Sequence, residues 1–423
     1  MKILHLISTF PPLTETFVLR EIRQLRKVGL DVIIGPLRPL HRTPPAIGFE
    51  DLNSLVRGAG WFSVDMLKAL LFFSLRKPHQ LVECLKIALR SLDHPQHFAK
   101  MLYVLLSSMR LAYCSRNEGI EFVRADFLHT QALAARFLKS LLGVPYGITV
   151  YTVVGHYKRT VLEEIVNGAA VLIADTLQTR EFLLSIGAPQ DRVHLIRNGV
   201  SMDEFPMRYG QSADSPPIIL AAGSLIPKKG FHVLLSACAV LRERGTPFRC
   251  VLIGDGCERA RLGSQKKALG LDDCVEMLGY LSLAELREWY YRATLFVMPS
   301  VISPTGETDG LPTVIIEALA CGLPVIGTHT AGIPEVIQHG VNGILVPADA
   351  PKPLADGIQM LLDRPDLRQK FGTEGRRLVE RDFCLERKVE ALCDLFVGDL
   401  MSTTVRPRVG ESIADTAQWS RIR

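Results

Sequence analysis

The chain has 423 residues, of which 48% are hydrophobic and 22% charged, and its net charge is +5. These values are close to those of soluble globular proteins, and the length predicts two or more domains. No apolar stretch reaches the roughly 18–20 residues of a membrane-spanning helix, and the nine cysteines form no C-x-x-C pair, so the composition argues against an integral membrane protein and against a zinc site.

The first residues, M-K-I-L-H-L-I-S, indicate a first strand rather than a signal peptide. We therefore expect a cytoplasmic chain with reduced thiols. A helical pattern follows, E-T-F-V-L-R-E-I-R-Q-L-R-K, with Phe17, Val18, Ile22 and Leu25 on one face, and then a second strand, L-D-V-I-I-G. This is a βαβ start, in which the turn after the first strand lies where open α/β sheets bind ligands.

A basic helical segment covers residues 55–120 approximately. It contains nine Lys/Arg residues against four acids, an excess that equals the net charge of the whole chain. Its helices could simply pack on the N-terminal domain, or they could lie at a membrane surface with Leu and Phe on one side and Lys and Arg on the other. Such a local patch indicates an anionic partner such as the inner membrane face, and we expect no nucleic-acid partner.

Strand and helix patterns alternate through the rest of the chain. In the first half the strand patterns include D-F-L-H-T and P-Y-G-I-T-V-Y, and after the polar linker Arg208–Pro217 they include P-I-I-L-A-A-G-S and T-L-F-V-M-P-S. Apolar strands that alternate with helices predict parallel sheets covered on both faces. The sequence therefore predicts an α/β fold with two doubly wound, Rossmann-like domains facing across a cleft, over residues 1–207 and 216–400, and a disordered tail over 401–423.

A basic loop follows the first strand of the second domain, in A-A-G-S-L-I-P-K-K-G-F-H. Lys228 and Lys229 precede Gly230 and a predicted helix. The free N–H groups and the positive dipole end of a helix N-terminus favour an anion, and a lysine beside them suits a phosphate. The alternative is that the two lysines only form a solvated loop.

Two acids lie near another predicted helix start, in T-D-G-L-P-T-V-I-I-E-A-L-A-C-G. Asp309 lies on the turn, and Glu317 lies eight residues later in an apolar run, where a carboxylate is costly to bury without a partner. A ligand at this helix start would meet both acids and the backbone N–H groups of Gly310–Thr313, and a carboxylate can hold a ribose diol. The alternative is that Asp309 caps the helix and Glu317 pairs with a core Lys or Arg.

Taken in order, these and further motifs resemble one known family. They are F-P-P-L-T-E-T-F-V-L-R-E-I, R-N-G-V-S-M-D-E-F, K-K-G-F, V-L-I-G-D-G, V-E-M-L-G-Y, F-V-M-P-S, D-G-L-P-T-V-I-I-E-A-L-A-C-G-L-P-V-I-G-T and A-G-I-P-E-V-I-Q-H-G-V-N-G-I-L-V. They are similar to the motifs of GT-B retaining glycosyltransferases of family 4, most closely those of bacterial exopolysaccharide and lipid-linked oligosaccharide biosynthesis. The resemblance covers most of the chain to about Leu400.

The resemblance implies a nucleotide-diphospho-sugar donor, such as a UDP- or GDP-hexose, bound mainly by the C-terminal domain, and an acceptor bound by the N-terminal one. It implies no metal and no separate cofactor, because protein cations and helix dipoles stabilise the leaving diphosphate. It assigns Lys229 to the donor phosphate, Glu317 to the ribose and Asp309 to the donor sugar. The other donor-site positions that it implies are Ser224, Gly310, Leu311, Pro312, Thr313 and, in the loop beside the base, Tyr280.

Three features depart from the family pattern. Ser224 stands where the family has an arginine, whose charge and bidentate fork serine lacks. Asp309 stands where the family has a glutamate. In I-T-V-Y-T-V-V, Tyr151 stands where the family has a histidine near the reacting centre and Val154 where it has an aspartate, and His156 could substitute for that histidine. Loss of one phosphate cation or donor of this kind costs about 3–4 kcal/mol of transition-state stabilisation.

The sequence therefore predicts a retaining glycosyltransferase that moves a hexose from a nucleotide sugar to a lipid-linked or polysaccharide acceptor at the inner membrane face. Two alternatives stay open. One is a catalytically impaired relative that binds nucleotide or glycan in a biosynthetic complex, which the residues Ser224, Tyr151 and Val154 favour. The other is an epimerase of the same fold, which the K-K-G-F and D-G-L-P motifs disfavour.

Overall fold

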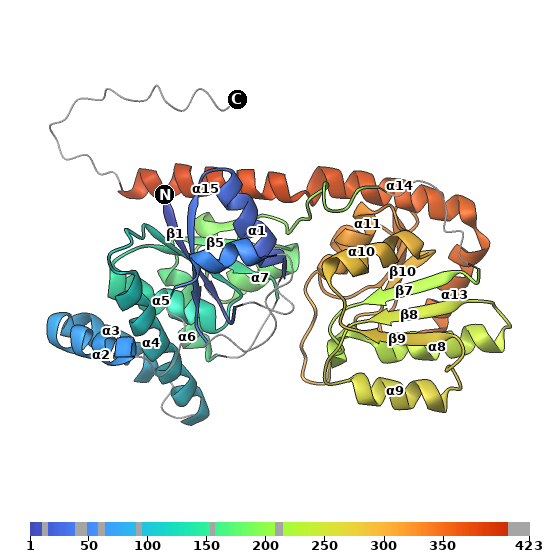
Figure 1. The fold of residues 1–423 in the computed structure, drawn as a ribbon, viewed down its shortest axis with the longest axis horizontal. Helices are drawn as coiled ribbons and strands as arrows, with labels where there is room; N and C mark the ends of the chain where they lie inside the picture. The colour runs from blue at the N-terminus through green and yellow to red at the C-terminus, as the bar shows by residue number, and fades with distance from the viewer. Residues whose placement is uncertain are drawn as a thin grey trace, which may run out of the picture.

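The computed structural model of the chain describes residues 1–10, 16–38, 49–57, 64–89, 95–152, 157–207 and 215–404. Two units follow each other along the chain, and each is built on a six-stranded sheet flanked by helices (Figure 1). Every strand pair in both sheets is parallel. The predicted α/β fold with two doubly wound sheets is confirmed.

The N-terminal sheet has the strand order β2-β1-β3-β4-β5-β6. Most strand residues are buried, as expected for a parallel sheet covered by helices. Its strands are β1 (Lys2–Ile7), β2 (Asp31–Pro36), β3 (Phe122–Asp126), β4 (Tyr146–Val150), β5 (Val171–Ala174) and β6 (Val193–Leu195), and its connecting helices are α1 (Thr16–Lys27), α5 (Thr130–Leu142), α6 (Arg159–Gly168) and α7 (Leu177–Ser185), with the 3-10 turns η1 (Glu50–Leu55) and η2 (Gln190–Arg192).

The prediction of a strand at D-F-L-H-T was wrong by a few residues. The strand is β3, whose residues F-V-R-A-D end at Asp126, and the following residues form a turn that leads into α5. Two charged residues, Arg124 and Asp126, are buried in this strand. Their charges interrupt the apolar pattern by which a buried strand is recognised.

The basic segment between β2 and β3 forms three helices, α2 (Val64–Arg76), α3 (Pro78–Leu89) and α4 (Pro95–Ser115). Helix α4 packs against α5 and contributes Met101, Val104, Leu105 and Leu111 to the core of the N-terminal unit. Helices α2 and α3 lie outside α4 and α5 and project away from the sheet (Figure 1). The segment is therefore part core helix and part projecting helix pair.

The C-terminal sheet has the order β12-β11-β10-β7-β8-β9. Its strands are β7 (Ile218–Ala222), β8 (Arg249–Ile253), β9 (Val275–Gly279), β10 (Leu295–Met298), β11 (Val325–Thr328) and β12 (Gly343–Val346). Its helices are α8 (Phe231–Glu243), α9 (Arg259–Ala268), α10 (Leu283–Arg292), α11 (Thr313–Ala320), α12 (Ile333–Val336), α13 (Pro351–Asp363) and α14 (Pro365–Asp382), with the 3-10 turn η3 (Pro227–Lys229) after β7.

The last helix, α15 (Leu385–Thr404), leaves the C-terminal unit and packs on the N-terminal one (Figure 1). Its apolar residues Val389, Leu392 and Phe396 are buried in one cluster with residues of β1 and α1. The N-terminal unit therefore includes α15, although we expected the C-terminal domain to continue to residue 400. The helix also covers 401–404 of the expected tail, and residues 405–423 lie outside the described residues.

Both sheets have a topological switch point, where the chain leaves two neighbouring strands in opposite directions. It lies between β1 and β3 in the N-terminal sheet and between β7 and β10 in the C-terminal sheet. Open α/β sheets bind their ligands outside the carboxyl ends of the strands at these points. The fold therefore predicts ligand-binding residues after β1 and β3 in one unit and after β7 and β10 in the other.

The packing of α15 gives a stability prediction. The Phe396 ring lies 5.2 Å from the Phe122 ring of β3, centroid to centroid, so Phe396→Ala should lower the free energy of unfolding by about 3–5 kcal/mol. The control is Asp394→Ala, at an exposed position of the same helix. Urea unfolding measures both variants, and equal midpoints would contradict the assignment of α15 to this core.

Candidate active site

The loop after β7 brings a lysine to the carboxyl end of β10. Gly230 ends this loop with a φ of +66°, and a Cβ atom at that position would lie 1.9 Å from the carbonyl oxygen of Pro299. The Val301 N–H also donates to the Lys228 carbonyl, at 2.9 Å. Only glycine permits such a close approach in this backbone conformation. Gly230 after the two lysines thus allows the basic loop to pack against the segment that follows β10.

Lys229 and Asp309 form an ion pair at the C-terminal switch point. Lys229 Nζ lies 2.6 Å from Asp309 Oδ2, and both side chains are largely shielded from solvent. The Ser300 hydroxyl donates to the same carboxylate oxygen at 3.2 Å, and Lys228 Nζ donates to the Thr308 carbonyl at 3.1 Å. The structure therefore brings together two predicted residues that belong to different loops of this half of the sequence.

The turn before α11 makes contact with the N-terminal unit. Gly310 has a φ of +65°, and a Cβ atom there would lie 2.1 Å from the Tyr151 carbonyl oxygen, just after β4. Leu311 and Pro312 are buried, and Thr313 begins the helix. The carboxyl ends of β4 and β10 thus meet at Gly310, and the free N–H groups at the start of α11 lie beside this contact.

Both carboxylate oxygens of Glu317 have partners in the structure. Arg20 of α1 donates from Nη2 to Oε1 at 3.0 Å, and the Tyr290 hydroxyl donates to Oε2 at 3.0 Å. Burial, followed by the charge of Glu317, raises the pKa of Tyr290 well above its usual value, so the phenol stays protonated as a donor. The alternative that Glu317 pairs with a core Lys or Arg is therefore confirmed. Its role toward a ribose stays a prediction.

Arg20 joins the two units through more than one contact. Its Nε atom lies 3.5 Å from Glu204 Oε2, and its guanidinium lies 5.4 Å from the centroid of the Phe205 ring. Glu204 and Phe205 belong to the segment that connects the two sheets, whereas Glu317 belongs to α11. A buried guanidinium is therefore held between α1, the connecting segment and α11.

Two other predicted donor-site residues lie at the ends of β7 and β9. Ser224 follows β7 and is partly buried. Tyr280 follows β9 with 60% of its surface exposed, and β8 separates β9 from β7 in the sheet. Their roles at the donor stay predictions.

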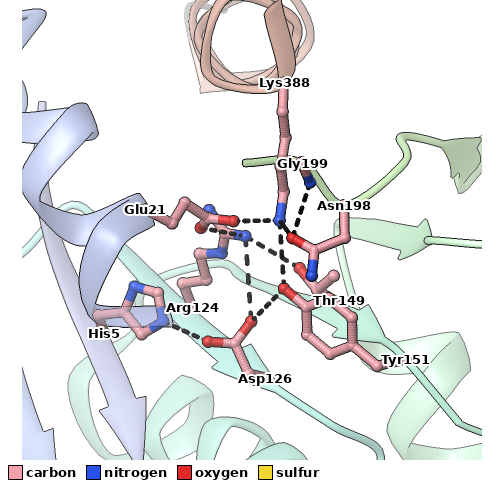
Figure 2. A network of polar contacts seen from close by, with 9 residues as sticks. All are labelled: His5, Glu21, Arg124, Asp126, Thr149, Tyr151, Asn198, Gly199 and Lys388. Atoms are coloured by element: carbon pink, nitrogen blue, oxygen red, sulfur yellow. Dashed lines mark hydrogen bonds and ion pairs between the residues drawn. The ribbon is translucent and has the colours of Figure 1, made fainter. Parts of the chain in front are cut away.

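The N-terminal switch point contains a buried network of charged groups (Figure 2). Glu21 of α1 forms ion pairs with Arg124 at 2.6 Å and with Lys388 at 2.5 Å. Lys388 Nζ also donates to Asn198 Oδ1 at 2.9 Å. All three charged side chains are almost fully buried. The network therefore joins α1, β3 and the C-terminal helix α15 around one carboxylate.

A second buried acid extends this network to Tyr151, just after β4. Asp126 Oδ2 lies 2.5 Å from His5 Nε2, and the Tyr151 hydroxyl donates to Asp126 Oδ1 at 3.4 Å (Figure 2). Burial opposes ionisation of Asp126, but His5, Arg124 and Lys388 together lower its pKa below the usual value. The carboxylate is therefore charged and can hold the two side chains above it.

Tyr151, the position where a histidine was expected, presents its backbone rather than its hydroxyl to the other unit. The hydroxyl points into the network and accepts from Lys388 Nζ at 3.4 Å (Figure 2). Burial, then the charges of Asp126 and Glu21, raise the Tyr151 pKa well above its usual value, so this phenol cannot act as an ionised base near neutral pH. Val154 and His156 lie outside the described residues.

Sequence analysis missed the residues of this network, although two of them left a signal. Glu21 lies one helical turn from Phe17 and from Leu25, within the apolar face of α1. Lys388 lies between Leu385 and Leu392 on the face of α15 that packs on the N-terminal unit. A charge inside an apolar helical face indicates a buried partner, and that partner could not be named from the sequence.

Comparisons with known proteins find similar glycosyltransferases. Residues 205–378 match the family model described as glycosyl transferases group 1. The chain is 27% identical over 364 residues to the amylovoran biosynthesis glycosyltransferase AmsK of Erwinia amylovora, covering 84% of this chain and 89% of AmsK. It is 28% identical over 400 residues to WcaL of Escherichia coli K12, named as a colanic acid biosynthesis glycosyltransferase, covering 90% of this chain and 96% of WcaL.

The fold matches solved structures over nearly its whole length. One is HepE of Anabaena in complex with UDP and glucose, with a TM-score of 0.67 and 18% identity, covering 94% of this chain and 100% of that one. The fold is the GT-B fold of these glycosyltransferases. In this chain the matched family segment contains Lys229, Asp309 and Glu317, and the network around Lys388 lies outside it.

Removal of the Lys388 charge should destabilise the chain strongly. Lys388→Met leaves Glu21 with one partner in a buried site, which should cost about 3–5 kcal/mol in the free energy of unfolding. The matched control is Lys352→Met at an exposed position of α13. Guanidinium unfolding compares the two, and a loss below about 1 kcal/mol, as for an exposed pair, would show that the network does not hold α15.

Asp175 gives a pH-dependent prediction. Burial raises its pKa to about 8, against hydrogen bonding from Thr179 and the charge of Lys388. The native state then keeps a proton that the unfolded state releases above about pH 4, so this group lowers stability as the pH rises toward 8. Asp175→Asn should remove that slope.

The measurement is the difference in melting temperature between the native chain and Asp175→Asn at several values between pH 5 and pH 8, because contributions from other groups cancel in the difference. The difference should shift in favour of the variant as the pH rises. A constant difference across this range would contradict a protonated Asp175.

Proposed function

We propose that the chain is a retaining glycosyltransferase that moves a hexose from a nucleotide-diphospho-sugar to a lipid-linked or polysaccharide acceptor. The observation that carries the proposal is the position of Lys229 and Asp309 at the C-terminal switch point, beside the start of α11 and next to the contact between Gly310 and Tyr151. A cation and free N–H groups at one place suit the diphosphate of a donor.

The comparisons support the donor and pathway parts of this proposal. HepE has been solved with UDP and glucose, and AmsK and WcaL are named for the biosynthesis of amylovoran and colanic acid. We propose that this chain likewise acts in exopolysaccharide biosynthesis and uses a UDP- or GDP-hexose. An acceptor on a lipid carrier would place the reaction at the cytoplasmic face of the inner membrane.

In this proposal the residues at the switch point act on the leaving group. Lys229 binds the diphosphate and stabilises the charge that develops as the glycosidic bond breaks, and the amides at the start of α11 share this task. Binding requires Lys229 to turn from Asp309 toward the phosphate or to contact both. Asp309 is then free to accept hydrogen bonds from the donor sugar. Glu317 lies one helical turn inside α11, and it could bind the ribose only if Arg20 released the carboxylate oxygen of Glu317 to which it donates.

A second function is favoured by two observations at the same site. Ser224 brings no charge to the end of β7, and the Tyr151 hydroxyl is buried in the network rather than directed to the other unit. A relative with weakened chemistry would bind nucleotide in this cleft and transfer no sugar. The two functions differ in turnover and not in binding.

The test incubates the purified chain with a panel of nucleotide sugars and a lipid-extract acceptor, and follows nucleoside diphosphate release and product formation. We expect one donor to be consumed, and we expect the product to keep the donor's anomeric configuration by NMR. Nucleotide binding without any turnover would favour the second function. A folded sample that neither binds nor consumes any donor would contradict both.

Replacement of Lys229 should reduce turnover more than donor binding. Lys229→Ala removes a charge that is needed most when the diphosphate leaves, so kcat should fall by about 10²–10³. Lys352→Ala, at an exposed position of α13, is the matched control and should keep the native rate. Initial rates at saturating donor measure kcat for both variants. An unchanged kcat in Lys229→Ala would contradict a role of Lys229 in stabilising the leaving diphosphate.

A further inference from the structure

Helix α2 carries large apolar side chains on the face that points away from the protein. Val64, Leu67, Leu71 and Leu75 are 69%, 60%, 54% and 77% exposed. Their spacing of three, four and four residues places them in one stripe along the helix. Contiguous apolar surface of this kind on a soluble protein marks a site of interaction.

The opposite face of α2 is already used for packing. Ala69 and Phe73 are buried in the core cluster of the N-terminal unit, and α2 packs against α4. The helix is therefore apolar on two opposite faces, and the residues that the structure describes cover only one of them. A helix with this pattern requires a second apolar environment for its outer face.

Exposed basic residues border the stripe. Lys68 and Arg76 lie on α2 and Lys86 on α3, and all three are exposed. Helix α3 adds two further exposed apolar residues, Val82 and Leu89. Of the two acids on these helices, Asp65 lies 3.8 Å from Lys68, and Glu83, which is half-exposed, pairs with Arg136 of α5 at 3.1 Å. The outer surface thus combines apolar side chains with an excess of positive charge.

The shape of this surface favours a bilayer over a protein groove. The α2–α3 pair projects from the N-terminal unit as a ridge (Figure 1), and a ridge can enter the soft boundary between headgroups and acyl chains. None of the helices that the structure describes is long and apolar enough to cross a bilayer. Helix α2 has 13 residues, about 20 Å at 1.5 Å per residue, which suits a helix that lies in the plane of the membrane.

We propose that the α2–α3 helix pair docks the chain on an anionic lipid bilayer, with Val64, Leu67, Leu71 and Leu75 entering the acyl-chain boundary and Lys68, Arg76 and Lys86 contacting anionic headgroups. The binding itself needs neither donor nor acceptor. Its use in catalysis rests on the proposed function, because it would hold the N-terminal unit at the surface where a lipid-linked acceptor lies.

The experiment is co-sedimentation of the full chain with two kinds of vesicle, one of phosphatidylcholine alone and one that also contains phosphatidylglycerol. No nucleotide sugar is present, so a failure of the proposed transfer reaction does not affect the result. We expect the native chain to sediment with the anionic vesicles, and to sediment less at high salt because screening weakens the contacts with the headgroups.

Two variants separate the apolar and the charged contributions. Leu71→Asp/Leu75→Asp should reduce the vesicle-bound fraction at least tenfold at every salt concentration, and Lys68→Gln/Arg76→Gln/Lys86→Gln should remove the preference for phosphatidylglycerol. The matched control is Met360→Asp, since Met360 is a half-exposed apolar residue on α13 of the other unit, and it should bind as the native chain does. Circular dichroism verifies that each variant is folded.

Three outcomes would overturn the proposal. The native chain could fail to sediment with either kind of vesicle, or the Leu71→Asp/Leu75→Asp variant could bind as well as the native chain. Alternatively, sedimentation velocity without lipid could show a dimer that this variant dissolves, in which case a second copy of the chain covers the stripe.

Discussion

The buried pairing of Glu21 with both Arg124 and Lys388 is the interaction that holds the last helix of the chain on the N-terminal unit. It joins three elements that are far apart in the sequence, α1, β3 and α15, at a place without solvent. Charges in such a place are tolerated only when each has a partner. Because Lys388 comes from the last helix, the chain must return from the C-terminal sheet to the N-terminal one before the network is complete.

This constraint reaches the candidate active site through Tyr151. Its hydroxyl is held by Lys388 and Asp126, and its carbonyl oxygen lies against Gly310 of the other unit. The network therefore fixes the backbone just after β4, at the position where the turn before α11 of the other unit approaches it. The Lys229–Asp309 pair lies beside this contact, where in the proposed function it would supply charge for a diphosphate, and the arginine that contacts Glu317 supplies a second link between the units.

Much of the fold and part of the site could be predicted from the sequence. Apolar strands alternating with helices gave both sheets, because burial on two faces imposes a continuous apolar pattern. Lys229 and Asp309 became candidates because each lies beside a predicted helix start, where free N–H groups favour an anion. Chain order and local spacing were sufficient for these features.

The rest could not be predicted because it depends on contacts between distant segments. Arg20 and Glu317 are 297 residues apart, and nothing near either residue names the other. The same holds for Lys388, whose helix would be assigned to the C-terminal domain by chain order alone. The buried charges in β3 even displaced the predicted strand, since an arginine and an aspartate read as surface residues until their partners are known.

The central claim is that a donor diphosphate binds at the C-terminal switch point, and a structure of the chain with UDP or GDP bound tests it most directly. The account predicts phosphate oxygens within hydrogen-bonding distance of Lys229 Nζ and of the amides at the start of α11, beside the contact between Gly310 and Tyr151. A diphosphate bound elsewhere, with Lys229 still paired only to Asp309, would contradict the account.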